Sequence, residues 1–324
     1  MVDTEALMSQ FEIGKGCSVE QFANARKRGL LLVVFAQKEE DVPKRVQMAQ
    51  ETVLQAEGLM LLGKPFFSRI DIVITSADTR YVDRDCGKTK QALLDALKSH
   101  RTVFVHEDRG DAFSGIKNFG FALQSRHGID YTMTLSPEAR SYLTQETIDA
   151  VTQAVCDGAI VVGVATGELT QSILEGRVAG TCALWNTMAM LSVGGFDMAA
   201  AGKTIDDREV SYVKGWNTEK GEVFYALAGV EEMVPLACLV DKFGPCIAPV
   251  YPAGEGVKRY QAPDPMKEPE LYKRHCSKMG TKYERQSAHL YRVKRDVSHL
   301  KGGVMEKYRT WATAPAQGST VPQS

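Results

Sequence analysis

Residues 30–35 form an uninterrupted apolar run, Leu-Leu-Leu-Val-Val-Phe, and this run restricts the fold more than any other feature. A strand with one face in water alternates apolar and polar residues, whereas a strand buried on both faces is apolar throughout. Helix-like segments separate this strand from four further strand-like segments, which predicts a doubly wound, mostly parallel α/β sheet flanked by helices. The predicted strands cover residues 30–35, 70–74, 102–105, 131–135 and 159–163, and the predicted helices cover residues 46–56, 90–98, 115–124 and 143–156.

The composition excludes several other classes of protein. Hydrophobic residues make up 44% of the 324 residues and charged residues 24%, which excludes a disordered or collagen-like chain. The apolar runs are far shorter than the roughly 20 residues of a membrane-spanning helix, and the first residues do not resemble a secretory signal. The seven cysteines form no C-x-x-C pair, which is typical of reduced thiols. We therefore expect a cytoplasmic protein and, from the formal net charge of -1, no nucleic-acid ligand.

Charge is distributed unevenly along the chain. Residues 257–309 contain 14 Lys and Arg against 6 Asp and Glu, with tyrosines between the basic residues. We predict a helical lead-in at 1–29, an α/β domain at 30–256, a basic helical C-terminal extension at 257–311 and a disordered tail at 312–324. Basic residues with interleaved tyrosines suit an anionic membrane surface, so peripheral membrane binding through 257–309 is one expectation. The alternative is that the basic residues of this segment lie on solvent-exposed helix faces and bind no membrane.

Several familiar catalytic motifs do not occur in the sequence. Gly87-Lys88-Thr89 and Gly202-Lys203-Thr204 both lack the glycine that a Walker A loop needs five positions earlier. No G-x-G-x-x-G follows the first predicted strand, and neither H-E-x-x-H nor G-x-S-x-G is found. These patterns therefore give no support to a P-loop, a dinucleotide-binding site, a zincin or an α/β-hydrolase.

A set of segments in fixed order resembles the GT-A glycosyltransferases of the large inverting family 2, over roughly residues 30–252. The most specific segment is Val193-Gly-Gly-Phe-Asp197 followed by the acidic pair Glu231-Glu232, and a helix with Asn118 and Gly120 supports it. The resemblance implies a Rossmann-like GT-A fold. It also implies inverting transfer of a sugar from a nucleotide-diphosphate donor to a hydroxyl of a glycan or lipid-linked acceptor. The other matching segments are 33–43, 72–79, 115–122, 130–138, 180–187 and 242–249.

The resemblance assigns roles to individual residues. In the family, an acidic residue at the start of the helix after the Gly-Gly-Phe-Asp element is the base that deprotonates the acceptor. Here Glu231 or Glu232 holds that place, and stabilisation of the helix N-terminus is the alternative role. The donor-binding candidates are Gln37, Ser76, Asp78, Lys117, Asn118 and Ser136.

The expected metal site departs from the family pattern. Family members carry an Asp-x-Asp whose carboxylates hold Mg²⁺ or Mn²⁺ against the diphosphate, whereas this chain has Ser136-Pro137-Glu138 at that place. Glu138 and His275 are the remaining candidate ligands for Mn²⁺ or Mg²⁺. Basic side chains could replace the missing metal charge. The candidates near the predicted strand ends are Arg80, Arg84, Lys88, Arg109 and Lys117.

Two other functions stay open beside glycosyl transfer. The loss of the paired Asp residues favours a catalytically silent protein that binds a nucleotide or glycan or scaffolds partner enzymes, but the retained Glu-Glu pair speaks against it. A nucleotidyltransferase that makes a nucleotide sugar would share the early strands. Such an enzyme usually has a Gly-rich loop after the first strand, and residues 36–41, Ala-Gln-Lys-Glu-Glu-Asp, contain no glycine.

Overall fold

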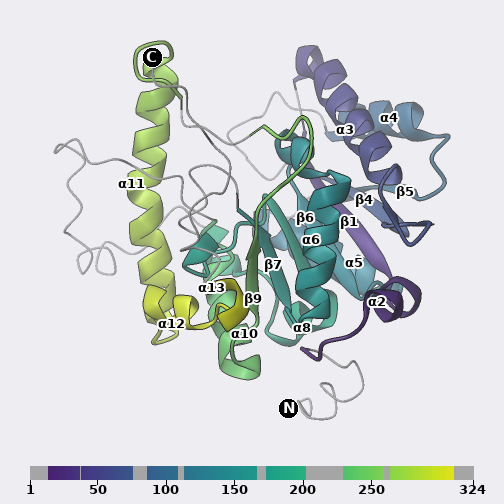
Figure 1. Cartoon of the computed structure of the whole chain (residues 1–324). Helices are drawn as coiled ribbons and strands as arrows, with labels where there is room; N and C mark the ends of the chain where they lie inside the picture. The colour runs from purple at the N-terminus through teal and green to yellow at the C-terminus, as the bar shows by residue number, and fades with distance from the viewer. Residues whose placement is uncertain are drawn as a thin grey trace, which may run out of the picture.

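A seven-stranded sheet forms the centre of the molecule (Figure 1), and its order is β5-β4-β1-β6-β8-β7-β9. This computed structural model describes residues 14–36, 38–75, 86–108, 113–165, 173–201, 229–258 and 263–309. Neighbouring strands run parallel, except that β8 is antiparallel to both β6 and β7. The strands of this sheet are β1 Arg28–Phe35, β4 Arg69–Thr75, β5 Val103–Asp108, β6 Tyr131–Leu135, β7 Val161–Val164, β8 Cys182–Asn186 and β9 Ile247–Val250.

The predicted fold class is confirmed. The five predicted strands correspond to β1, β4, β5, β6 and β7, and the mostly parallel sheet flanked by helices is consistent with the expected GT-A-like architecture. Strands β8 and β9 were not predicted. β8 passes directly into a helix, with Asn186 capping it by accepting from the Ala189 N–H at 2.9 Å, so no turn residue separates the two elements. β9 contains Pro249, which strands tolerate at the edge of a sheet, and β9 is an edge strand.

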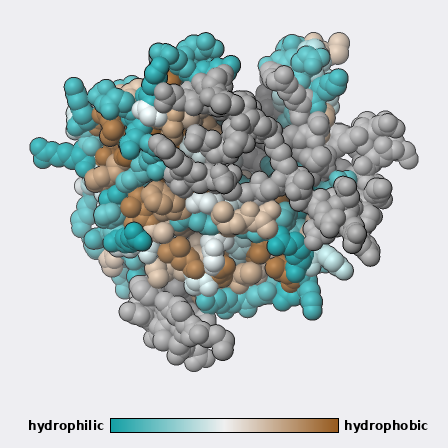
Figure 2. Space-filling view, turned by 180° about the vertical axis from the view of Figure 1, so that it is seen from behind, coloured by the Kyte–Doolittle hydropathy of each residue, from teal (hydrophilic) through white to brown (hydrophobic). Residues whose placement is uncertain are grey.

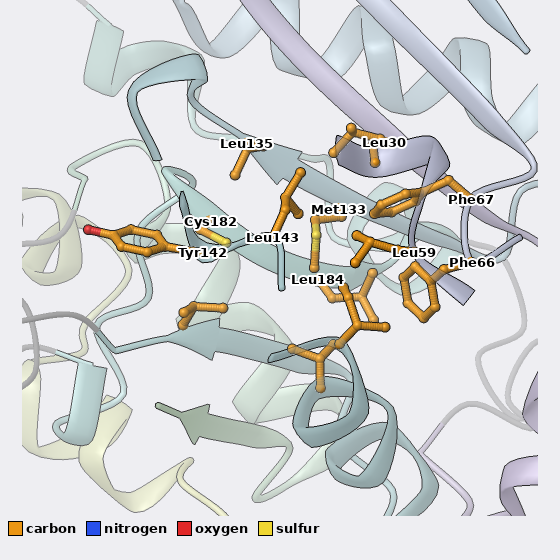
Figure 3. Packing of buried hydrophobic residues seen from close by; sticks show 14 of the residues in the cluster. Leu30, Leu59, Phe66, Phe67, Met133, Leu135, Tyr142, Leu143, Cys182 and Leu184 are labelled. Carbon is orange, nitrogen blue, oxygen red and sulfur yellow. The ribbon is translucent and has the colours of Figure 1, made fainter. Parts of the chain in front are cut away.

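The helices cover both faces of the sheet. The alternation of side chains along β1 divides the core, because Leu30, Leu32 and Val34 pack in one hydrophobic cluster whereas Leu31 and Val33 pack in the other. Figure 3 shows part of the first cluster, in which side chains of the sheet meet the surrounding loops and helices. The first cluster includes residues of α2 Val19–Ala25, α3 Val42–Glu57, α4 Cys86–Leu97 and α6 Gln145–Cys156, and the second includes residues of α5 Phe113–Arg126, α8 Thr187–Ser192 and α10 Met233–Phe243.

Short elements complete the described chain. A two-stranded antiparallel ribbon lies between α3 and β4 in the sequence.

On the face shown in Figure 2, hydrophobic residues lie in the left and lower central parts of the described surface, with hydrophilic residues around them. In the described ranges no helix is both long enough and apolar enough to cross a membrane. The short elements are η1 Glu39–Asp41, β2 Met60–Leu61, β3 Lys64–Pro65, η2 Pro137–Tyr142 and η4 Met198–Ala201.

The predicted basic extension is helical and packs onto the sheet domain. It forms α11 Pro269–Arg292, α12 Val297–Gly302 and α13 Glu306–Arg309. Leu290 and Leu300 are fully buried in the second hydrophobic cluster, and Val304 forms a parallel bridge with Ile247 of β9. Residues 1–13 of the predicted lead-in and the predicted disordered tail at 312–324 lie outside the described residues. The division of the chain into domains stays a prediction.

Gly176 provides a test of how α12 is held. Its φ is +78°, and a Cβ there would collide with the backbone carbonyl of Leu300. We expect Gly176→Ala to lower the free energy of unfolding by more than the roughly 1–2 kcal/mol that a left-handed backbone costs an L-residue. Gly63→Ala is the matched control, because Gly63 has a φ of +76° and open space around its Cβ position. Denaturant unfolding of both variants measures the difference, and equal losses would contradict a close contact at Gly176.

Candidate functional site

A cleft of about 390 Å³ lies where β1 and β6 end. Parallel strands that share an edge bring their carboxyl ends together, which is where ligands bind in sheets of this class. Leu31, Val33 and Phe35 of β1 line the cleft because alternate side chains of a strand share one face. The polar and charged side chains of the lining are Arg45, Lys117, Thr134, Ser136, Glu138, Thr181, Glu231, Glu232, Lys282 and Arg285.

Lys117 lies between the two predicted acidic residues. Its ammonium group donates to Glu231 Oε1 at 3.1 Å and to Glu232 Oε1 at 2.9 Å. The side chain of Lys117 is 3% exposed and that of Glu232 1%, whereas 19% of the Glu231 side chain is exposed. These three residues therefore form a buried ion triad, and Glu231 is the more accessible of its two carboxylates.

The backbone around the triad comes from glycine-containing segments. The N–H of Gly180 donates to Glu232 Oε1 at 2.8 Å, and the N–H of Val230 donates to Glu231 Oε2 at 3.1 Å. A Cβ on Gly180 would collide with Lys117 and Glu232, and a Cβ on Gly229 would collide with Glu232. Glycine at both positions therefore allows the backbone to approach the charged side chains closely. Glu232 Oε2 is buried and has no hydrogen-bond partner among the described residues.

The three charges shift one another's pKa values. Burial by itself would raise the pKa of Glu231, but the positive charge of Lys117 outweighs burial and holds that pKa at about 2. Burial and the neighbouring charge of Glu231 raise the pKa of Glu232 above its ordinary value, despite the attraction of Lys117. Burial would lower the pKa of Lys117, yet the charges of Glu232 and Glu231 raise it. Glu231 and Lys117 are therefore both charged at neutral pH.

The segment 193–197 connects the triad to two helices. The Asn118 side chain donates to the Phe196 carbonyl at 3.0 Å and accepts from the Phe196 N–H at 2.7 Å. The N–H of Asp197 donates to the Glu231 carbonyl at 3.0 Å, and its carboxylate lies 3.2 Å from Nδ1 of His289 on α11. Asn118 is not part of the cleft lining. In this structure it fixes the turn beside the acidic pair.

Glu138 binds an arginine that the sequence did not suggest. Arg45 Nη1, on α3, lies 2.7 Å from Glu138 Oε1, and the Ser136 hydroxyl donates to Glu138 Oε2. Burial would raise the pKa of Glu138, but the hydrogen bonds from Ser136 and Arg45 outweigh it and lower that pKa. Ser136 and Glu138 both line the cleft, so the structure brings these two candidates together with Lys117 and the acidic pair.

The described residues do not complete a divalent-cation site by themselves. Mg²⁺ and Mn²⁺ need several oxygen or imidazole ligands, some of which a substrate phosphate can supply, and in the described part of the chain no three His, Cys, Asp or Glu side chains come together. The second metal candidate, His275, is buried on α11 and does not belong to the cleft lining. The carboxylate of Glu138 is already bound to a guanidinium group.

Most of the other predicted residues are not among those that the structure describes. The donor-binding candidates Gln37, Ser76 and Asp78 are outside the described residues, as are Arg80, Arg84 and Arg109, which were candidates for replacing metal charge. Lys88 is described, but its ammonium pairs with Glu39 at 2.9 Å and it does not line the cleft.

Sequence reasoning missed Arg45, Gly180, Lys282 and Arg285 as cleft residues. The spacing of Lys282 and Arg285 places both on one side of a helix, which the basic pattern of the segment could have indicated. Their side chains line the cleft, whereas the sequence pattern predicts a membrane surface or solvent as the surroundings of the basic residues of this segment. Membrane binding through 257–309 stays a prediction.

Comparison with known proteins does not identify a family. No protein-family model matches the chain, and no curated protein matches its sequence. Among solved structures, a mannosyltransferase from Pyrobaculum calidifontis in complex with GDP-Man and Mn²⁺ is 14% identical; the match covers 90% of this chain and 84% of that one, with a TM-score of 0.38. The 4-diphosphocytidyl-2C-methyl-D-erythritol synthase of Anaerococcus prevotii is 10% identical. That match covers 74% of this chain and 92% of the synthase, with a TM-score of 0.40.

A cytidylyltransferase from Leptospira borgpetersenii also matches, with 10% identity, coverage of 52% of this chain and 64% of that one, and a TM-score of 0.35. Similarity at this level does not assign an activity.

Proposed function

We propose that the protein is a nucleotide-sugar-dependent glycosyltransferase that inverts the configuration of the transferred sugar. The observation that carries this proposal is the triad of Lys117, Glu231 and Glu232 in a cleft at the carboxyl ends of β1 and β6. The sequence resemblance to family 2 enzymes supports the same activity. The donor is a nucleotide-diphosphate sugar, and the acceptor is a hydroxyl group of a glycan or a lipid-linked sugar.

We assign the role of catalytic base to Glu231. A base must come within hydrogen-bond distance of the hydroxyl that it deprotonates. The exposed part of the Glu231 side chain makes such an approach feasible, whereas the Glu232 side chain is 1% exposed and its Oε2 lies against Gly229. Glu232 instead accepts from both Lys117 and Gly180, so it is a positioning residue that holds the ammonium group beside Glu231.

The reaction is a single displacement. The acceptor hydroxyl gives its proton to a Glu231 carboxylate oxygen, and the acceptor oxygen forms a bond to the anomeric carbon of the donor sugar. The bond between that carbon and the diphosphate oxygen breaks, and the nucleoside diphosphate leaves with the electron pair. Because attack and departure occur on opposite faces, the anomeric configuration inverts.

The donor contacts follow from the cleft lining. Ser136 lines the cleft at the end of β6, so its hydroxyl can bind the donor. Gln37, Ser76 and Asp78 remain proposed donor contacts from the sequence. No step uses a metal at Glu138 and His275, because the described geometry does not bring ligands together there.

A ligand panel tests the proposal. UDP-, GDP-, CDP- and dTDP-linked sugars are each added to the full chain, and both the melting temperature and the release of free nucleotide are measured. A ligand present at 100 times its Kd adds about 2.7 kcal/mol to the free energy of unfolding, so one nucleotide class is expected to raise the melting temperature clearly. The same class is expected to release nucleotide when an acceptor is supplied. The absence of any shift across the panel would contradict the proposal, and a shift without turnover would favour the catalytically silent binding protein.

A further inference from the structure

Glu138, the carboxylate that the sequence predicts as a metal ligand, binds an arginine side chain of the protein itself. Arg45 Nη1 lies 2.7 Å from Glu138 Oε1, and the Ser136 hydroxyl binds the other oxygen of the same carboxylate. A guanidinium group at this distance repels a divalent cation and occupies the oxygen that would coordinate it. Arg45 therefore competes directly with a metal for Glu138.

Basic side chains reach the cleft from two separate helices. Arg45 comes from α3, and Lys282 and Arg285 come from α11; these two helices stand on either side of the central strands in Figure 1. Together with Lys117 they give the cleft lining four basic side chains against three acidic ones, Glu138, Glu231 and Glu232. Lys117 is engaged by two carboxylates, and α3 and α11 supply the other three cations of the lining.

These cations suit a diphosphate group. Guanidinium groups bind phosphate oxygens through two parallel hydrogen bonds, and a lysine supplies a further positive charge. Fixed cations around a departing diphosphate stabilise the negative charge that develops on it, which is the role that a metal ion has in other transferases.

We propose that Arg45, Lys282 and Arg285 bind and neutralise the diphosphate of the nucleotide donor, in place of a divalent cation. This inference rests on the proposed function, since it concerns the donor of that reaction. It adds that nucleoside diphosphates bind without added metal, and that α11 forms one wall of the diphosphate site.

Binding of UDP, GDP, CDP and dTDP by isothermal titration calorimetry tests this inference. The full chain is titrated once with EDTA and once with Mn²⁺. We expect one nucleoside diphosphate to bind in EDTA, with a Kd that changes less than about twofold when Mn²⁺ is added. Binding that occurs only with Mn²⁺ would overturn the inference but leave the proposed function standing. If none of the four binds in either condition, both fail.

Glu138 could either pair with Arg45 or bind a metal, and substitution of Glu138 should change the affinity for the nucleoside diphosphate in opposite directions in these two cases. If Glu138 only pairs with Arg45, Glu138→Gln removes a negative charge and releases the guanidinium group, so the nucleoside diphosphate is expected to bind about threefold or more tightly in EDTA. If Glu138 is a metal ligand, the same variant binds more weakly in Mn²⁺. Weaker binding would overturn the inference.

Substitution of the cations completes the test. Arg45→Gln, Lys282→Gln and Arg285→Gln are each expected to raise the Kd about tenfold, because each removes a charged hydrogen-bond donor. Lys273→Gln is the matched control, since Lys273 is an exposed lysine on α11 outside the cleft. Its Kd is expected to stay within about twofold of the parent protein. Equal effects of the control and the cleft variants would overturn the inference, and the melting temperature of each variant shows that it is folded.

Discussion

Lys117→Met lowers the free energy of unfolding by an expected 3–5 kcal/mol or so, the usual result of removing one partner from a buried ion pair. Methionine fills a similar volume but removes the ammonium group from which both the Glu231 and the Glu232 carboxylate accept. The Lys117 side chain is 3% exposed, so water does not replace the lost charge at low cost. Glu232 Oε2 already has no hydrogen-bond partner among the described residues, which limits how the pair can rearrange.

The loss is expected to depend on pH. In the parent protein the pKa of Glu231 lies at about 2, below its ordinary 4.5, chiefly because the charge of Lys117 outweighs burial. A carboxyl group whose pKa is lowered by folding stabilises the folded state at pH values above its ordinary pKa. For Glu231 this stabilisation is lost as the pH falls from 4.5 toward 2. The difference in the free energy of unfolding between the parent protein and Lys117→Met should therefore be largest near neutral pH and smaller in acid.

Denaturant unfolding followed by circular dichroism measures both effects. Lys88→Met is the control, because Lys88 forms an exposed pair with Glu39 and should cost at most about 1 kcal/mol. A loss for Lys117→Met no larger than that of the control would mean that the triad does not stabilise the fold.

Glu231→Gln reduces turnover by an expected factor of about 10² to 10⁴, which is the usual contribution of a general base. The amide keeps the shape of the side chain and can still accept from Lys117, but it cannot take a proton from the acceptor. Nucleotide binding is expected to stay near the parent value, because the residues proposed to hold the diphosphate are elsewhere in the cleft. Steady-state kinetics and calorimetry on the same preparation separate the two effects.

The acid limb of the pH profile distinguishes Glu231 from Glu232 as the base. A base with a pKa of about 2 stays ionised throughout the pH range in which the protein can be assayed. The kcat/KM of the parent protein should therefore not decrease as the pH is lowered past 4.5, the ordinary pKa of a glutamate. If Glu232 were the base, its raised pKa would place the acid limb above 4.5. Glu232→Gln supplies the comparison, since substitution of a positioning residue is expected to reduce turnover less than substitution of Glu231 does. An acid limb above 4.5 that Glu232→Gln abolishes would reverse the assignment.

Regular local patterns predicted most of the fold. The apolar run of β1 and the helical spacing of α3 and α6 are properties of neighbouring residues, so the sequence displays them directly. β9 escaped prediction because it is four residues long and contains Pro249, and its partners are β7 and the distant Val304. Nothing local identifies such a strand.

The candidate site was predictable only in part. Glu231 and Glu232 were predicted from the family resemblance, which implies an acidic residue at the start of the helix after the Gly-Gly-Phe-Asp element, and the structure places both in the cleft. The structure places the ammonium group of Lys117 between the two acidic residues, a contact that the sequence did not indicate, and its role as a donor contact stays a prediction. The pairing of Arg45 with Glu138 spans 93 residues, and no spacing rule reveals a contact between a helix and a loop at that separation.

The position of α11 has a consequence for how the protein is made. The strands that form the floor of the cleft are complete by residue 135, but Lys282 and Arg285 join its lining only when α11 has docked. A chain still emerging from the ribosome can therefore build its sheet while one wall of the cleft is missing. The lining of the cleft is therefore complete only after α11 has been synthesised and has docked, and a shorter nascent chain presents a different site.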